Sequence, residues 1–122
     1  MAPKLTANEG RDMIDWSRIK SLRDEVGAED FDEIVDVFIE EVTDMTDRLR
    51  TVPQPGALSE NLHALKGSAL NLGFTTFAEL CQSGESLAAQ GHADQINLAQ
   101  VLECYEASRT AFLSGLAEGA AV

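Results

Sequence analysis

The chain has 122 residues, a formal net charge of −12 and a hydrophobic content of 44%, which together fit one ordinary globular domain. The strong negative charge argues against a nucleic-acid partner, because contacts to phosphates need basic patches. No apolar run approaches the roughly 18 residues of a membrane span and no apolar signal core precedes the first helical pattern, so we expect a cytoplasmic protein without a membrane partner.

Helical periodicity begins near residue 13, and residues 1–12 are predicted to form a flexible N-terminal arm. We expect residues 13–122 to form a single helical bundle domain. Asp15 suits the N-cap of a short first helix, since its side chain can accept a hydrogen bond from a free backbone N–H group. Gly27 suits the end of that helix.

A long second helix is predicted from about Glu29 to Arg50, with an apolar stripe on one face and carboxylates on the other. From Asp24 to Asp47 the chain contains eleven carboxylates and neither Lys nor Arg. A solvated helix face is the favoured interpretation. The alternative is that this negative field biases the choice of partner. A metal site is disfavoured because the carboxylates spread along one face.

Pro53, Pro55 and Gly56 interrupt the helical pattern before the third helix. The third helix carries an apolar stripe from Leu58 to Leu72. Gly73 is suited to a left-handed C-terminal cap of this helix.

Thr76 and Glu79 have the spacing of a capping box at the start of a fourth helix, which Gly91 ends. A last helix is predicted from about Asp94 to Leu116. Four substantial helices with short connections predict an all-α fold, an antiparallel four-helix bundle with a short extra N-terminal helix.

The third helix carries a polar patch that its core-facing stripe does not explain. At about 100° per residue, His63 points about 140° away from Leu58. Lys66 and Gly67 follow at positions i+3 and i+4 and share its surface, and Leu70 is an apolar residue on the same face. A mid-helix glycine costs about 1 kcal/mol relative to alanine, so we infer that bare backbone is needed beside His63.

Taken singly, His63 and Lys66 are typical of solvated surface residues, and Gly67 of a contact between helices. Together on one face they indicate a different role. An exposed imidazole with a cation on one side and cleared space on the other suggests a site that accepts and hands over a phosphoryl group.

This region resembles the signature of the histidine-containing phosphotransfer (HPt) domains of multistep phosphorelays. That signature runs His-x-Leu-Lys-Gly-Ser-Ser/Ala, then Leu-Gly, then a helix with Leu-Cys and an acidic residue. The matching residues of this chain are His63, Leu65, Lys66, Gly67, Ser68, Ala69, Leu72, Gly73, Leu80, Cys81 and Glu85. Gly84 departs from the family pattern, which usually has leucine there, and we expect weaker helix packing at that point.

The resemblance implies a phosphoryl carrier without a kinase domain of its own. His63 would accept the phosphoryl group from an aspartyl phosphate of a receiver domain through Nε2, and pass it to another receiver. Lys66 would offset the phosphoryl charge, and Gly67 would give the partner access to the helix. Ser59 and Leu70 are candidate partner-docking residues.

The same resemblance implies the partners and the cofactor requirement. The partners would be response-regulator receiver domains and a hybrid sensor histidine kinase. The chain itself would bind no metal, and Mg²⁺ would be held by the receiver domain. We expect a monomer.

Two other functional classes stay open. One is a module of the same fold that docks a response regulator or a kinase without phosphotransfer. The other is an enzyme or metal protein built on His63, His92, Cys81 and Cys104. Their scattered spacing disfavours this class, as does the expected inward direction of Cys81.

Overall fold

The computed structural model describes residues 13–51 and 55–118. Within these ranges the chain forms five α-helices and two short 3₁₀ turns, at Pro55–Ala57 and Ala93–Gln95. The α-helices are α2 (Trp16–Val26), α3 (Ala28–Thr51), α4 (Leu58–Asn71), α5 (Thr75–Ala89) and α6 (Leu98–Ala117). The expected arm at residues 1–12 and the break at Pro53 lie outside the described residues.

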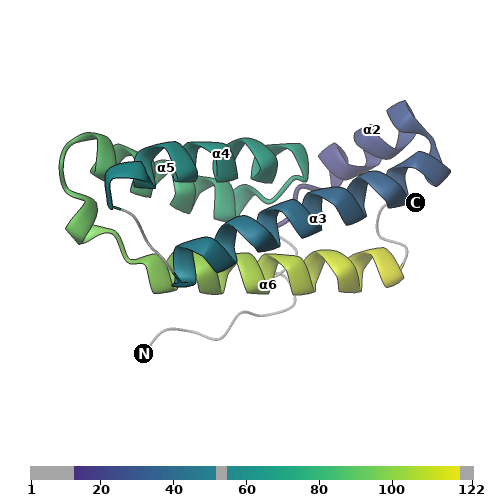
Figure 1. Cartoon of the computed structure of the whole chain (residues 1–122). Coiled ribbons are helices and arrows are strands. Elements are labelled where there is room, and N and C mark those ends of the chain that lie inside the picture. The colour runs from purple at the N-terminus through teal and green to yellow at the C-terminus, as the bar shows by residue number, and fades with distance from the viewer. Residues whose placement is uncertain (1–12, 52–54, 119–122) are drawn as a thin grey trace.

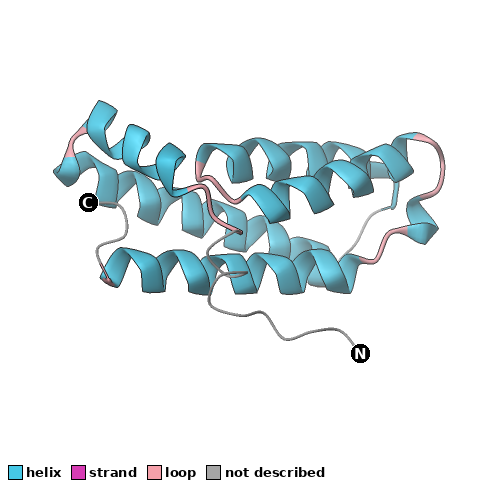
Figure 2. Cartoon of the chain, turned by 180° about the vertical axis from the view of Figure 1, so that it is seen from behind, coloured by secondary structure: helices cyan, strands magenta, loops and turns pink. Residues whose placement is uncertain are grey.

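The four long helices α3 to α6 lie side by side as an antiparallel bundle, and α2 packs at one end against α3 (Figure 1). The view from behind shows short loops between α2 and α3 and between α4 and α5, and a longer connection with a 3₁₀ turn between α5 and α6 (Figure 2). The predicted all-α bundle with a short extra N-terminal helix is therefore confirmed. None of the helices in the described ranges is long and apolar enough to cross a membrane.

Aromatic rings from three helices and one turn meet in the core. Phe74, in the turn before α5, lies with its ring centroid 5.3 Å from that of Phe112 on α6. The ring centroids of Phe77 and Tyr105 are 5.4 Å apart, and Trp16 of α2 stacks on Phe112 at 6.0 Å. Such aromatic pairs add stabilisation to that of buried apolar area, so this cluster holds α2, α5 and α6 together.

The chain entering α2 is tied to the turn between α4 and α5. Asp15 caps α2 as predicted, since its side chain accepts a hydrogen bond from the backbone N–H of Arg18. The backbone N–H of Asp15 donates to the carbonyl of Gly73 at 2.7 Å, and that of Thr75 donates to the carbonyl of Met13 at 3.0 Å. These two bonds fix the position of the α4–α5 turn.

The start of α5 differs from the capping box that the sequence predicts at Thr76 and Glu79. Phe74 occupies the N-cap position, and no side chain caps the helix. Because the carbonyl of Met13 already accepts from the N–H of Thr75, one of the free donors of this helix end is satisfied by a distant part of the chain. A local pattern contains no information about that contact.

The start of α6 also differs from the prediction. The helix begins at Leu98, whereas Asp94 lies in the preceding 3₁₀ turn. Asn97 is the N-cap, since its side chain accepts a hydrogen bond from the N–H of Gln100 at 3.0 Å.

Gly84 has the opposite role to the one expected from its departure from the family pattern. It is buried in α5, and a Cβ atom at this position would lie 2.8 Å from Cδ1 of Leu62 on α4. The missing side chain therefore allows α5 to approach α4 closely. Since His63 follows Leu62 and Glu85 follows Gly84, this close approach also brings those two residues near each other.

The turn at Gly73 provides a test of how the α4–α5 connection is held. Gly73 has φ 72° as predicted, and a Cβ atom there would lie 2.7 Å from the carbonyl oxygen of Asp15. Gly91 has a similar φ of 81° but nothing within 4 Å. We expect Gly91→Ala to lower the free energy of unfolding by about 1 kcal/mol through backbone strain alone, and Gly73→Ala to lower it by about 2–4 kcal/mol through strain and the added clash. Urea unfolding of both variants checks this, and equal losses would contradict it.

Candidate functional site

Helix α4 presents His63 to solvent, as the sequence predicts. The side chain of His63 is 68% exposed, whereas Leu62 and Leu65 on the opposite side of the helix are fully buried. The helix is anchored by this apolar stripe, so the histidine is held on a rigid element while its ring stays accessible.

A carboxylate from the neighbouring helix orients the imidazole. Nδ1 of His63 lies 2.8 Å from Oε1 of Glu85 on α5. Since an ionised carboxylate only accepts hydrogen bonds, Nδ1 carries the proton in this contact. In the neutral ring the lone pair then resides on Nε2, for which the described part of the chain provides no hydrogen-bond partner. Nε2 is therefore the nitrogen available for attack on an electrophile.

Lys66 meets the same carboxylate from the other side. Its ammonium group donates to Oε2 of Glu85 at 3.0 Å and to Oε1 of Gln82 at 2.7 Å. The amide of Gln82 is oriented in turn, because its Nε2 donates to the hydroxyl of Ser86 at 3.1 Å. One carboxylate thus joins the imidazole and the ammonium group, and Gln82 holds the lysine.

These contacts favour the ionised form of Glu85. The hydrogen bond from Lys66 lowers the pKa of Glu85 below its ordinary value, and the contact with His63 acts in the same direction, against a partial opposing effect of burial. Because the folded-state pKa is the lower one, the pairing stabilises the fold above the ordinary glutamate pKa. That stabilisation is lost as the pH falls through the lowered value.

The rest of the patch is open. Gly67 is exposed, and a Cβ atom there would meet nothing within 4 Å, so no packing against another helix explains the glycine. Leu70 is 54% exposed. Ser59 lies one turn before His63 and is partly exposed. The structure therefore places all five sequence-predicted site residues on α4, with His63 and Lys66 in contact through Glu85.

Glu85 and Gln82 are the members of this site that reasoning from the sequence missed as functional residues. The sequence indicates Glu85 only as the acidic position of the HPt signature, and it does not single out Gln82. Their i, i+3 spacing places both on one face of α5. This spacing was the available sequence signal, but it does not identify the helix that the face meets.

The other candidate nucleophiles and ligands do not join the site. Cys81 is fully buried, and burial raises the pKa of its thiol to about 12, so the thiolate is scarce at neutral pH. His92 is exposed in the turn before α6. In residues 13–51 and 55–118, no three His, Cys, Asp or Glu residues are grouped so that they could hold a metal ion.

Comparison with protein-family models gives a match to the Hpt domain over residues 33–111, which is more than half of the chain. The chain belongs to the Hpt domain family. The match includes α4 and α5 completely, and thus the contact between His63 and Glu85. Membership implies a phosphotransfer role in phosphorelays, in which Hpt domains serve as phosphocarriers without kinase activity and interact with receiver domains and kinases. Comparisons with curated proteins and with solved structures gave no match.

The orientation of the His63 imidazole can be tested by removing the carboxylate of Glu85. We expect Glu85→Ala to reduce the share of the tautomer protonated at Nδ1, because that proton loses its acceptor. Nitrogen chemical shifts of the His63 ring, recorded above the titration range of imidazole, measure the two tautomers. The control is Glu79→Ala, an exposed carboxylate of the same helix, which should leave the ring unchanged. An unaltered tautomer ratio in Glu85→Ala would contradict the assignment.

Proposed function

We propose that this chain accepts a phosphoryl group on Nε2 of His63 from an aspartyl phosphate of a receiver domain and passes it to another receiver. The observation that carries the proposal is the hydrogen bond between Nδ1 and Glu85 on a ring that is 68% exposed. It leaves the lone pair of Nε2 directed away from the only carboxylate that contacts the ring in the described part of the chain.

In the proposed step, the Nε2 lone pair attacks the phosphorus atom of the aspartyl phosphate. A bond between nitrogen and phosphorus forms, the bond between phosphorus and the aspartate oxygen breaks, and its electron pair leaves with the carboxylate. The imidazole becomes positively charged and keeps its proton on Nδ1. Glu85, 2.8 Å from Nδ1, compensates that charge. Electrostatic compensation of this kind is a major source of rate enhancement.

Lys66 supplies the positive charge for the phosphoryl oxygens. Lys66 lies one turn after His63 on α4, and its ammonium group is held by Glu85 and Gln82 of α5. Little reorganisation of the lysine is therefore needed when the phosphoryl group arrives. A lysine cation between these two side chains disfavours a divalent metal ion there. The Mg²⁺ of the transfer would accordingly be held by the receiver domain.

The open surface beside His63 is where the partner would dock. Gly67 lets a loop of the receiver approach the helix backbone, and Leu70 and Ser59 extend the contact along α4. The proposal includes a hybrid sensor histidine kinase as the other partner, a cytoplasmic location and a monomeric chain.

The acceptor is tested by transfer of labelled phosphate from a phosphorylated receiver domain. We expect His63→Gln to abolish acceptance and to change the melting temperature little, because the exposed ring makes few packing contacts. His92→Gln, at the other exposed histidine, serves as the matched control and should retain acceptance. Labelling of His63→Gln, or a loss of many degrees in its melting temperature, would contradict the assigned role. Binding without any transfer to the wild type would instead favour a docking module.

The role of the open surface beside His63 is tested by adding a bulky side chain at Gly67. We expect Gly67→Phe to lower transfer from the receiver by more than about tenfold, since a misplaced contact in a docked complex has effects of that size, while unfolding remains cooperative. Ala99→Phe adds the same bulk at an exposed position of α6 and is expected to have no effect on transfer. Full transfer by Gly67→Phe would contradict the need for cleared space.

A further inference from the structure

The ammonium group of Lys66 has two oxygen acceptors that differ in charge. Oε2 of Glu85 lies 3.0 Å from Nζ, and Oε1 of Gln82 lies 2.7 Å from it. Glutamate and glutamine side chains have nearly the same shape, and each can provide an oxygen as acceptor. What distinguishes the two positions is therefore that one acceptor is an anion and the other is a neutral amide.

The anion occupies the position that also contacts the imidazole. Oε1 of Glu85 is 2.8 Å from Nδ1 of His63, whereas the side chain of Gln82 bonds to Lys66 and Ser86. A negative charge on residue 85 would stabilise the positive charge that the ring acquires on phosphorylation. A negative charge on residue 82 would instead act directly on the ammonium group alone.

Lys66 and Glu85 are largely withdrawn from solvent, which strengthens the effect of charge at this point. Their side chains are 21% and 19% exposed. Charges at such a position are screened less than charges on an open surface. A second carboxylate against the same ammonium group would therefore offset much of its positive charge before a phosphoryl group arrives.

The orientation of the Gln82 amide follows from its two neighbours. The ammonium group of Lys66 only donates hydrogen bonds, so the amide oxygen has to face it. The amide nitrogen then faces the hydroxyl of Ser86, to which it donates at 3.1 Å. The amide is thus held with its oxygen on the lysine and brings no charge to the site.

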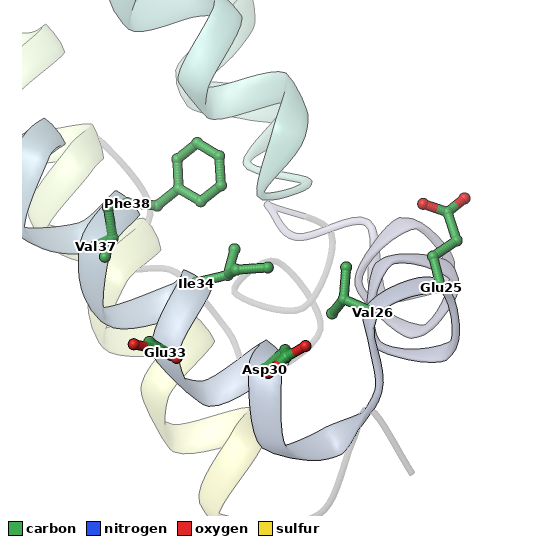
Figure 3. Close-up of a pocket in the computed structure, with 7 residues that line it drawn as sticks. All are labelled: Glu25, Val26, Asp30, Glu33, Ile34, Val37 and Phe38. Carbon is green, nitrogen blue, oxygen red and sulfur yellow. The ribbon is translucent and has the colours of Figure 1, made fainter.

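A neutral residue at position 82 contrasts with other parts of this acidic chain, whose net charge is −12. Between α2 and α3, for example, a pocket is lined by Glu25, Asp30 and Glu33 together with apolar residues (Figure 3). At the His63 site one carboxylate is instead shared by an imidazole and an ammonium group. Within the described ranges, no other carboxylate forms an ion pair with Lys66.

We propose that the neutral amide of Gln82 positions Lys66 and leaves its positive charge free to act on the phosphoryl oxygens. Glu85 compensates charge on the imidazole, and Gln82 provides a hydrogen bond without such compensation. Gln82 acts through Lys66 and is a positioning residue. This inference rests on the proposed transfer at His63.

A purely structural role for Gln82 makes the opposite prediction for one substitution. Gln82→Glu keeps the shape of the side chain and its acceptor for Lys66, so a structural role would tolerate it best. Gln82→Met removes the acceptor and adds no charge. We expect Gln82→Glu to lower the rate of phosphoryl acceptance at least about tenfold, and Gln82→Met to lower it only about threefold.

The rates are measured on the full chain with phosphoramidate, a small phosphoryl donor that has no docking surface. His63→Gln gives the background labelling of other groups. Gln100→Glu is the same substitution at an exposed position of α6 and changes the net charge equally. This control should keep the wild-type rate, and a thermal melt of each variant checks that it is folded.

A second measurement tests the shared ammonium group without phosphoryl transfer. The hydrogen bond from Lys66 holds the pKa of Glu85 below its ordinary value. Gln82→Glu places a second carboxylate on the same ammonium group and should raise the pKa of Glu85, whereas Gln82→Met should leave it low. The side-chain carboxyl carbon shift of Glu85, followed by nuclear magnetic resonance as the pH is lowered, reports this difference.

Three results would overturn the role of Gln82 while the wild type still accepts phosphate on His63. One is acceptance by Gln82→Glu at the wild-type rate or faster than by Gln82→Met. Another is an equal loss in Gln100→Glu, which would mean that net charge alone sets the rate. The third is an unchanged pKa of Glu85 in Gln82→Glu. If the wild type itself accepts no phosphate on His63, the proposed function fails, and the role of Gln82 fails with it.

Discussion

The carboxylate of Glu85 is the contact on which the exposed site depends. One of its oxygens accepts from the imidazole of His63 and the other from the ammonium group of Lys66. The first bond sets the ring orientation and the protonated nitrogen, and the second holds the cation close by. Without this carboxylate, the exposed imidazole of His63 and the partly buried side chain of Lys66 would each sample more rotamers. With it, the imidazole and the neighbouring ammonium group have a defined geometry.

The position of that carboxylate follows from how closely α4 and α5 pack. Gly84 leaves room for Leu62, and the neighbouring residues Glu85 and His63 meet as a result. The turn between the two helices is fixed by Gly73 and by backbone hydrogen bonds to the segment before α2. Here the packing supports a polar contact at the surface, which makes the bundle a scaffold for the site.

Helical periodicity predicts the helices and the solvent-facing side of α4 from the sequence. It fails where contacts between helices determine the structure. The apolar stripe of α4 predicts correctly that His63 faces solvent. The predicted capping box at Thr76 is wrong, because the carbonyl of Met13, from a distant segment, accepts a hydrogen bond from the backbone N–H of Thr75 at that helix end. Gly84 was misjudged because the atom it accommodates, on Leu62, belongs to another helix. The partner of Glu85 was missed for the same reason.

We propose that Glu85 reserves Nδ1 of His63 and leaves Nε2 as the phosphoryl acceptor. The most direct measurement is nuclear magnetic resonance of the phosphorylated chain, in which coupling between phosphorus and the ring nitrogens identifies the phosphorylated atom. We expect a phosphoryl group on Nε2, with the proton on Nδ1 still in contact with Glu85. A phosphoryl group on Nδ1 would contradict it, because that nitrogen would have to leave the carboxylate in order to react.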